Sequence, residues 1–292
     1  PASDGGLDII TTVSEFGARI GNYIYLDSDP ESNGIPDETL LIHTQYRDLY
    51  VSYDGGLNFK SIVEITHGAL KDGAVESIYL NPFWPNYVYL LTNDNKIYIS
   101  SNRAISFEIA VDQPMQAIKD YTGLRFTFDK SSPERFIWYG YRECSDYKCK
   151  KGSYYTLDGG KSFHVLLDDA PRCNFAGSTL NSDILPVDQN LIICDQEIAD
   201  TRYFKIISST DYFNNNSKEL FAQTIGSAST GAFFVVAEVK GDDLVAQVSV
   251  NGDIFAEALF PKNLKVDNQR GYTILNSKSN TIFLHVTTNN VH

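Results

Sequence analysis

Hydroxyl and carboxylate side chains recur at a fixed spacing in two stretches of the chain, and they are the first candidates for a functional site. Residues 52–59 read SYDGGLNF and residues 156–163 read TLDGGKSF, so both fit Ser/Thr-x-Asp-x-Gly-x-x-aromatic. In this pattern, the Asp-box, the two polar side chains are expected to hydrogen-bond the backbone N–H groups of their own turn. Glycine accepts a positive φ there. We therefore interpret the pattern as a structural turn whose polar groups are not free for chemistry.

Three weaker copies of the Asp-box extend the series. They begin at residues 100, 209 and 249, so that five starts are separated by 48, 56, 53 and 40 residues. One four-stranded propeller blade occupies roughly 40–50 residues. The positions expected to hold these turns are Ser52, Asp54, Gly56, Phe59, Ser100, Asn102, Phe107, Thr156, Asp158, Gly160, Phe163, Ser209, Asp211, Ser249 and Asn251.

Between the boxes, short apolar or aromatic-rich segments alternate with polar tips, and little of the sequence has helical periodicity. Such segments at regular spacing predict β-strands. Each repeat has an opening strand, a second strand, a tight tip and a third strand that leads into the box. The opening strands are expected at 75–80, 123–128 and 272–275, and the second strands at 40–44, 87–91, 136–141, 233–239 and 281–286.

This repeat predicts an all-β fold. We expect a β-propeller with Asp-box (BNR-type) repeats, with about five to six four-stranded blades of a larger ring. Five blades are whole in this count, and 272–275 and 281–286 supply two strands of a sixth. The expected domain is 1–292, a partial propeller that ends in mid-blade, and a chain that begins with Pro1 is expected to be a piece of a longer protein.

Composition restricts the partners of the protein. The formal net charge is −13, from 24 basic and 37 acidic residues. A nucleic-acid partner would require clustered Lys and Arg, so we exclude one. No segment approaches the roughly 20 apolar residues of a membrane span. The acidic charge itself is expected to serve solubility, with a specific cationic partner as the alternative.

Cysteines and a sequon indicate the compartment. Four cysteines permit three pairings. Cys144 and Cys149 flank a short tip, while Cys173 and Cys194 lie near strand ends of consecutive blades, so we expect the pairs 144–149 and 173–194 and an oxidising compartment. The alternative, a zinc site, requires a more regular spacing. Asn215 begins a glycosylation sequon, Asn-Asn-Ser. No metal site and no cofactor are expected.

An enzyme is the main alternative in function. An Asp-box glycoside hydrolase of the sialidase kind requires three converging arginines, a Tyr nucleophile and an early Arg-Ile-Pro, or else two facing carboxylates. Residues 16–20 read FGARI, but Gly21 stands where proline is required. The histidines show no metal-ligand spacing. His43 and His285 lie in expected strands, where either could titrate on acidification. We expect no catalytic residues.

The chain resembles the Vps10 domain of the sortilin and vacuolar-protein-sorting receptors, of the fungal type. The resemblance extends from about Phe16 onward. It rests on the two good boxes, on CNFAG at 173–177 with IIC at 192–194, and on FPKNL at 260–264, QRGYTIL at 269–275 and IFLHV at 282–286. Asp-boxes alone occur in many propellers, so the cysteine pair and the QRGYTIL segment narrow the resemblance. Fungal receptors of this kind carry two such domains in tandem.

The resemblance implies a ten-bladed propeller, of which this chain would be the N-terminal half, on the lumenal side of Golgi and endosome membranes. It implies a transmembrane receptor that carries soluble vacuolar or lysosomal hydrolases, or their precursors, from Golgi to endosome. The other partners would be the remainder of the propeller and a membrane span outside this chain. Ligand binding would involve Tyr272 and Thr273, whereas the alternative makes Tyr272 an ordinary strand residue.

Overall fold

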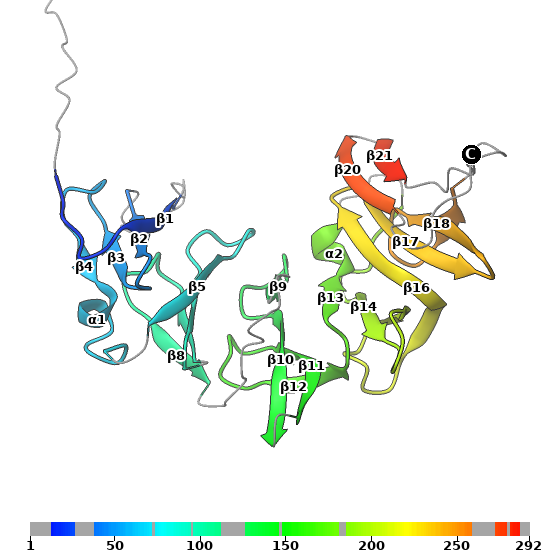
Figure 1. Ribbon diagram of the computed structural model, residues 1–292, viewed down its shortest axis with the longest axis horizontal. Coiled ribbons are helices and arrows are strands. Elements are labelled where there is room, and N and C mark those ends of the chain that lie inside the picture. The colour runs from blue at the N-terminus through cyan, green and yellow to red at the C-terminus, as the bar shows by residue number, and fades with distance from the viewer. Residues whose placement is uncertain are drawn as a thin grey trace, which may run out of the picture. The chain divides into compact units, whose positions relative to one another are not determined.

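The computed structural model describes residues 13–26, 38–71, 74–94, 96–111, 126–145, 148–180, 185–258, 272–278 and 281–286. Its regular structure is antiparallel β-strand apart from two four-residue helices, α1 (Ile62–Ile65) and α2 (Ala176–Thr179). The all-β prediction is confirmed. The chain divides into two compact units, Pro1–Gln113 and Pro114–His292. Figure 1 labels most of the elements of both units.

The first unit contains two four-stranded sheets, each with its strands in chain order. The predicted strands 40–44 and 75–80 are found at those positions. One sheet contains β1 (Ile20–Tyr25), β2 (Leu40–Thr44), β3 (Leu49–Ser52) and β4 (Lys60–Ser61), and the other contains β5 (Val75–Leu80), β6 (Val88–Thr92), β7 (Ile97–Ser100) and β8 (Glu108–Val111).

The core of the first unit draws buried apolar side chains from both sheets. Leu41 and Val51 come from the first sheet, Val88 and Leu90 from the second, and Ile62 from α1. Full burial of such a side chain stabilises the fold by about 1.5–3 kcal/mol. This common core explains why two blade-like sheets behave as one compact unit.

The second unit begins with a third four-stranded sheet in chain order. Trp138, in its second strand, is fully buried and packs against Phe126 with ring centroids 4.6 Å apart. The strands are β9 (Phe126–Phe128), β10 (Phe136–Ser145), β11 (Lys148–Thr156) and β12 (His164–Asp168).

A seven-stranded sheet follows, where the sequence predicted two separate blades. A two-stranded sheet, β20 (Tyr272–Lys278) with β21 (Thr281–Val286), corresponds to the two strands expected of a sixth blade. The seven strands are β13 (Arg172–Phe175), β14 (Ile192–Glu197), β15 (Phe204–Ser209), β16 (Lys218–Thr230), β17 (Phe233–Lys240), β18 (Asp243–Ser249) and β19 (Phe255–Glu257).

Strand β16, yellow in Figure 1, joins the two expected blades because it pairs on both sides. Its first half pairs with β15 and its second half with β17, and the two ladders meet at Thr224. Its one glycine, Gly226, has φ 132°, and the ladder shifts register beside it. A bulge of this kind bends a strand without ending it. The fourth strand of one repeat therefore continues into the opening strand of the next.

Two negative findings concern the part of the chain that the structure describes. No helix there is long and apolar enough to cross a membrane. Among the same residues no group of three or more His, Cys, Asp or Glu side chains could hold a metal ion.

Candidate functional site

The first Asp-box turn, between β3 and β4, is held together by its own polar side chains. The Ser52 hydroxyl donates to Asp54 Oδ1 at 2.8 Å and accepts the Gly56 N–H at 2.8 Å. Asp54 in turn accepts the Asn58 N–H at 2.9 Å and the Asn58 side-chain amide at 2.8 Å. The turn therefore uses both polar side chains of the motif internally.

The third turn, between β11 and β12, repeats this arrangement. Thr156 Oγ1 donates to Asp158 at 2.8 Å and accepts the Gly160 N–H at 2.9 Å. The Ser162 N–H and hydroxyl donate to Asp158 at 2.9 and 2.7 Å. In both turns the N–H of the first glycine bonds a carbonyl that precedes the second strand of the same sheet.

The second and fourth turns have the same bonds without the glycines. In the second, Ser100 accepts the Ala104 N–H at 2.9 Å and Asn102 accepts the Ser106 N–H at 3.0 Å. In the fourth, Ser209 accepts the N–H of Phe213, which occupies the glycine position, at 2.9 Å. The hydroxyl and the Asp or Asn side chain are therefore enough to define the turn.

The fifth turn, between β18 and β19, is one residue shorter. Ser249 accepts the Gly252 N–H at 2.8 Å, three residues along instead of four, and Asn251 accepts the Ile254 N–H at 3.0 Å. The aromatic that closes this turn is Phe255, which contacts Phe221 edge-on with ring centroids 4.9 Å apart.

Aromatic side chains fasten the other turns to their sheets. Phe163 of the third turn packs edge-on against Phe136 of β10, with ring centroids 5.7 Å apart. Phe59 of the first turn contacts Phe16 in the same way at 5.1 Å, and Phe107 of the second packs on the first unit's core. The fourth turn, which lacks an aromatic at this position, places Phe213 against a buried cluster instead.

The turn carboxylates are poor candidates for acid–base catalysis. The Asn58 side chain and N–H lower the pKa of Asp54 to about 2. Burial opposes the shift at Asp158, but the Ser162 hydroxyl and N–H still lower its pKa to about 2. A general acid requires a pKa near the working pH. These carboxylates are therefore charged acceptors that maintain the turn.

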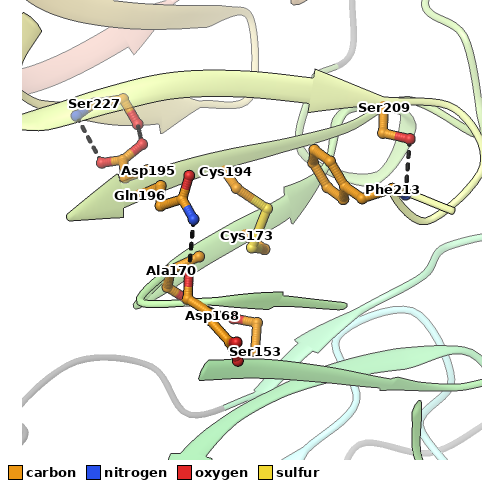
Figure 2. Close-up of a disulfide and its surroundings, with 10 residues drawn as sticks. All are labelled: Ser153, Asp168, Ala170, Cys173, Cys194, Asp195, Gln196, Ser209, Phe213 and Ser227. Atoms are coloured by element: carbon orange, nitrogen blue, oxygen red, sulfur yellow. Dashed lines mark hydrogen bonds between the residues drawn. A yellow bond between two sulfur atoms is a disulfide. The ribbon is translucent and has the colours of Figure 1, made fainter. Parts of the chain in front are cut away.

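Figure 2 shows the disulfide between Cys173 of β13 and Cys194 of β14, whose Cα atoms are 4.1 Å apart. The two residues lie directly opposite each other in the ladder. Nearby, the Ser153 hydroxyl donates to the Ala170 carbonyl at 2.6 Å, and the Gln196 amide to the Asp168 carbonyl at 2.9 Å. The disulfide therefore reinforces a sheet whose connection to β11 and β12 is also hydrogen-bonded.

A buried acid lies next to the disulfide, and the sequence analysis did not single it out. Asp195 is 1% exposed and accepts the N–H and hydroxyl of Ser227 in β16 at 3.0 and 2.5 Å (Figure 2). Arg172 Nη2 lies 3.1 Å from its carboxylate. Burial raises the pKa of Asp195, and Arg172 and Ser227 offset that shift only in part. The group joins three strands of the seven-stranded sheet.

The remaining predicted site residues are placed only in part. Tyr272 and Thr273 begin β20, opposite Val286 and His285 of β21, while their side chains lie outside the described residues. The side chains of Cys144 and Cys149 also lie outside, so that pairing stays a prediction. Asn215 is exposed in the fourth turn, where its N–H bonds Asp211 at 2.9 Å.

A pocket of about 490 Å³ lies in the first unit between α1 and the first two Asp-box turns. Its lining includes Tyr53 and Ile105, one from each turn, together with Ile65 of α1. No motif marked these residues, because the pocket forms only when two repeats pack side by side.

Repeated four-stranded meanders closed by Asp-box turns define an all-β protein built from propeller-type sheets. The Sortilin-Vps10 family model (Sortilin, neurotensin receptor 3) matches residues 47–292. The chain belongs to this family.

Three relatives match nearly the whole chain. Vacuolar protein sorting/targeting protein 10 of Komagataella phaffii is 36% identical over 288 residues, 96% of this chain and 18% of that protein. The protein of the same name in Zygosaccharomyces rouxii is 36% identical, and the match covers 97% of this chain and 17% of that protein. The uncharacterized membrane glycoprotein YNR065C of Saccharomyces cerevisiae is 32% identical, covering 97% and 24%. The chain thus spans a quarter or less of the length of each.

Solved structures resemble the chain more distantly. The protein lmo1340 of Listeria monocytogenes has a TM-score of 0.49 and 10% identity, covering 85% of this chain and 69% of its own. A GH74 xyloglucanase of Xanthomonas campestris has a TM-score of 0.45 and 11% identity, covering 76% and 36%. Similarity at this level does not bear on function.

Proposed function

We propose that this chain is part of the cargo-binding domain of a sorting receptor. The observation that carries the proposal is the match of the Sortilin-Vps10 family model to residues 47–292, supported by 36% identity to proteins named for vacuolar sorting and targeting. Its cargo is a soluble vacuolar or lysosomal hydrolase precursor, carried from Golgi to endosome. Residues 1–292 form the N-terminal half of a larger propeller that the remainder of the receptor completes.

The receptor domain works on the lumenal side of the membrane in this proposal. The Cys173–Cys194 disulfide is compatible with an oxidising compartment. Asn215 is exposed, as the acceptor of an N-linked glycan has to be. Expression in a secretory host, followed by glycosidase treatment, should lower the mass of the unmodified protein by one glycan more than that of Asn215→Gln.

Tyr272 and Thr273 are the ligand contacts in this proposal. Their strand, β20, pairs with β21, and its other edge has no partner strand among the described residues; an edge of this kind is what an extended peptide can join. His285, opposite Thr273 in the ladder, has an exposed side chain. The family match favours the receptor over the sialidase-like alternative.

A binding titration tests the proposal. A purified vacuolar hydrolase precursor is titrated against residues 1–292 and against the whole receptor domain, at neutral and mildly acidic pH. We expect saturable binding that weakens in acid and weakens further in Tyr272→Ala, while Tyr46→Ala, at a residue 75% exposed in the first unit, serves as the control. Turnover of a sialoside or glucan without binding of the precursor would contradict the receptor function and favour a glycoside hydrolase.

A further inference from the structure

The first and second sheets of the first unit have the same register, so their residues correspond one to one. Ile42 lies opposite Tyr50 in the first sheet, as Leu90 lies opposite Tyr98 in the second. The opening strands, β1 and β5, also shift register at the same place. Six corresponding pairs share one face of the two sheets: Ile20 and Val75, Tyr23 and Ile78, Leu40 and Val88, Ile42 and Leu90, Tyr50 and Tyr98, and Phe59 and Phe107.

In the second sheet this face is buried against the first sheet. Val75, Val88 and Leu90 are all 0% exposed. They share a core cluster with Leu41 and Val51 of the first sheet. Successive side chains of a strand point to opposite faces, so the first sheet turns one face towards the second sheet and has a second face on its other side. We call that second face the tyrosine face, and its residues are Ile20, Tyr23, Leu40, Ile42, Tyr50 and Phe59.

No other sheet covers the tyrosine face within the described part of the chain. Ile20 is 49% and Tyr23 69% exposed, whereas Val75, which corresponds to Ile20, is 0% exposed. Leu40 and Tyr50 are half-buried. A contiguous exposed apolar surface of this kind marks an interaction site. The same set of positions is therefore buried by a preceding sheet in one repeat and left partly open in the other.

Phe16, in the segment before β1, covers only the part of the tyrosine face next to the Asp-box turn. Its ring centroid lies 5.0 Å from that of Tyr50 and 5.1 Å from that of Phe59. Ile20 and Tyr23 belong to β1, which is the edge strand farthest from β4 in the sheet. The open part of the face therefore lies over β1 and the strand beside it.

The tyrosine hydroxyls indicate what a covering group has to provide. Tyr98 donates to the Ala69 carbonyl at 3.3 Å, and Ala69 lies in the segment that connects the first sheet to the second. The Tyr50 side chain has no hydrogen bond within the residues that the structure describes. The third sheet has Tyr154 at the same ladder position, opposite Trp138. The tyrosine therefore belongs to the repeat, and in the second sheet its hydroxyl bonds the connection from the preceding sheet.

We propose that the tyrosine face is the docking surface for another four-stranded sheet of the same kind, a further blade supplied by the remainder of the receptor. The docking sheet presents an aliphatic row like that of Leu41 and Val51, and the segment after its fourth strand supplies a carbonyl to Tyr50. This inference rests on the proposed function, in which the remainder of the receptor completes the propeller. The chain covers 18% of its Komagataella phaffii relative, which is long enough to contain further sheets.

Other occupants fit the tyrosine face less well. A second copy of this chain cannot offer the aliphatic row of its own first sheet, because Leu41 and Val51 are 0% exposed in that copy's core. An extended peptide would pair with the edge of β1. It would leave Tyr50, in the third strand of the sheet, without an acceptor.

Thiol labelling of Tyr23→Cys tests whether the face is covered. The variant is made in residues 1–292 and in the whole receptor domain, and modification is followed by mass spectrometry of the labelled peptides. We expect labelling at least about tenfold slower in the whole domain, because the docked sheet excludes the reagent. Tyr46→Cys is the matched control, since Tyr46 is 75% exposed at a tip of the same sheet and should react equally fast in both proteins.

The labelling experiment separates this proposal from the cargo-binding function, because no cargo is present. Protection of Tyr23→Cys in a receptor domain that binds no cargo would support the docking face and contradict the cargo role. Equal labelling rates in the two proteins would overturn the docking face, even in a domain that binds cargo. Protection that increases with the concentration of residues 1–292 alone would assign the face to a second copy and overturn the blade as its occupant.

Tyr50→Phe tests the hydrogen bond that the docking sheet supplies. This variant should lower the melting temperature of the whole receptor domain by about 1–2 °C and leave that of residues 1–292 unchanged. Tyr98→Phe is the matched control, because it removes the existing bond to the Ala69 carbonyl and should lower the melting temperature of both proteins. The same shift in both proteins for Tyr50→Phe would overturn the proposed carbonyl contact.

Discussion

Two Asp-box turns of this protein contain glycine at both left-handed positions, and two others reach the same geometry without any. The second residue of each pair donates its N–H to the Ser or Thr hydroxyl four residues earlier, at 2.8 to 2.9 Å in all four. The pairs are Gly55 and Gly56 (φ 68° and 97°), Gly159 and Gly160 (71° and 91°), Arg103 and Ala104 (58° and 65°), and Tyr212 and Phe213 (60° and 60°).

The glycine-free turns gain contacts that a glycine cannot make. Arg103 is fully buried and donates to the Leu26 carbonyl, just beyond β1, at 2.8 Å. Tyr212 stacks on Tyr155 of β11 with ring centroids 4.3 Å apart, and its hydroxyl accepts from Arg135 Nε at 3.0 Å. In both cases a strained residue reaches the preceding sheet. The hydroxyl and the Asp or Asn therefore define the turn, while the left-handed residues can connect neighbouring sheets.

Removal of the hydroxyl should have the largest effect. In Thr156→Val the buried Gly160 N–H loses its acceptor and Asp158 loses a donor, so we expect a loss of about 2–3 kcal/mol in the free energy of unfolding. Denaturant unfolding followed by the fluorescence of the buried Trp138 measures it. Thr127→Val, at a half-buried strand residue of the same sheet, is the control. A change below 0.5 kcal/mol, on the order of an ordinary surface substitution, would contradict the central place given to the hydroxyl.

Tyr212→Gly tests whether contact or strain dominates in a glycine-free turn. The variant loses the stack on Tyr155 and the bond from Arg135, but it also loses the cost of a left-handed tyrosine. We expect a net loss of about 1–2 kcal/mol, since a half-buried aromatic contributes more than the strain of one residue. Asp200→Gly is the matched control, because Asp200 is exposed with φ 59° and should become slightly more stable. If Tyr212→Gly is also stabilised, the contacts with the third sheet contribute little.

Glycine and alanine exchanged between the first two turns give a smaller effect. In Gly56→Ala a Cβ would meet Leu40 Cδ2 at 3.5 Å, an ordinary contact, so the cost is backbone strain of about 1–2 kcal/mol. Ala104→Gly relieves that strain, but it leaves a cavity and raises the conformational entropy of the unfolded chain. Its free energy of unfolding should therefore stay within about 1 kcal/mol of that of the unmodified protein. Thermal unfolding of both variants compares them. Shifts in the melting temperature that are equal in size and opposite in sign would mean that backbone strain alone distinguishes the two turns.

The difference between glycine-bearing and glycine-free turns explains how much of the fold could be predicted from the sequence. The glycine-bearing turns were evident as motifs, and their spacing predicted an all-β propeller-type fold with the strands 40–44, 75–80 and 281–286 at the observed positions. In the fourth turn, Phe213 takes the place of the glycine, so the residue types give no sign that its backbone has the same conformation. A pattern of residue types indicates which backbone conformations are intrinsically favourable. It does not indicate a strained conformation that tertiary contacts stabilise.

The junction of the fourth and fifth repeats could not be predicted for a related reason. Whether β16 ends or bends at Gly226 depends on pairing with β15 and β17, which lie on opposite sides of it. Gly226 has φ 132°, a backbone conformation that L side chains rarely adopt, and this conformation accounts for the glycine. Likewise, Asp195 is recognisable as a buried group only once β13, β14 and β16 are adjacent.

The smallest expected effect distinguishes Asp158 of the third turn from the buried Asp195 through the pH dependence of unfolding. The pKa of Asp158 is lowered to about 2 in the folded protein, so its stabilising contribution is present above the ordinary pKa of about 4 and disappears as the pH falls towards 2. The carboxylate is partly exposed, so Asp158→Asn should cost no more than about 1 kcal/mol above pH 4 and nothing near pH 2.

Asp195 should behave with the opposite sign. Burial raises its pKa, so the protonated carboxyl is favoured in the folded protein, and this contribution is complete below about pH 4 and is lost as the pH rises through the folded pKa. Relative to Asp195→Asn, the unmodified protein should therefore lose stability as the pH rises, whereas relative to Asp158→Asn it should gain stability. Unfolding curves of the three proteins between pH 2 and pH 8 provide the measurement. If the stability difference between the unmodified protein and each variant changed with pH in the same direction, Arg172 and Ser227 would keep Asp195 ionised in the folded protein, as Ser162 keeps Asp158 ionised.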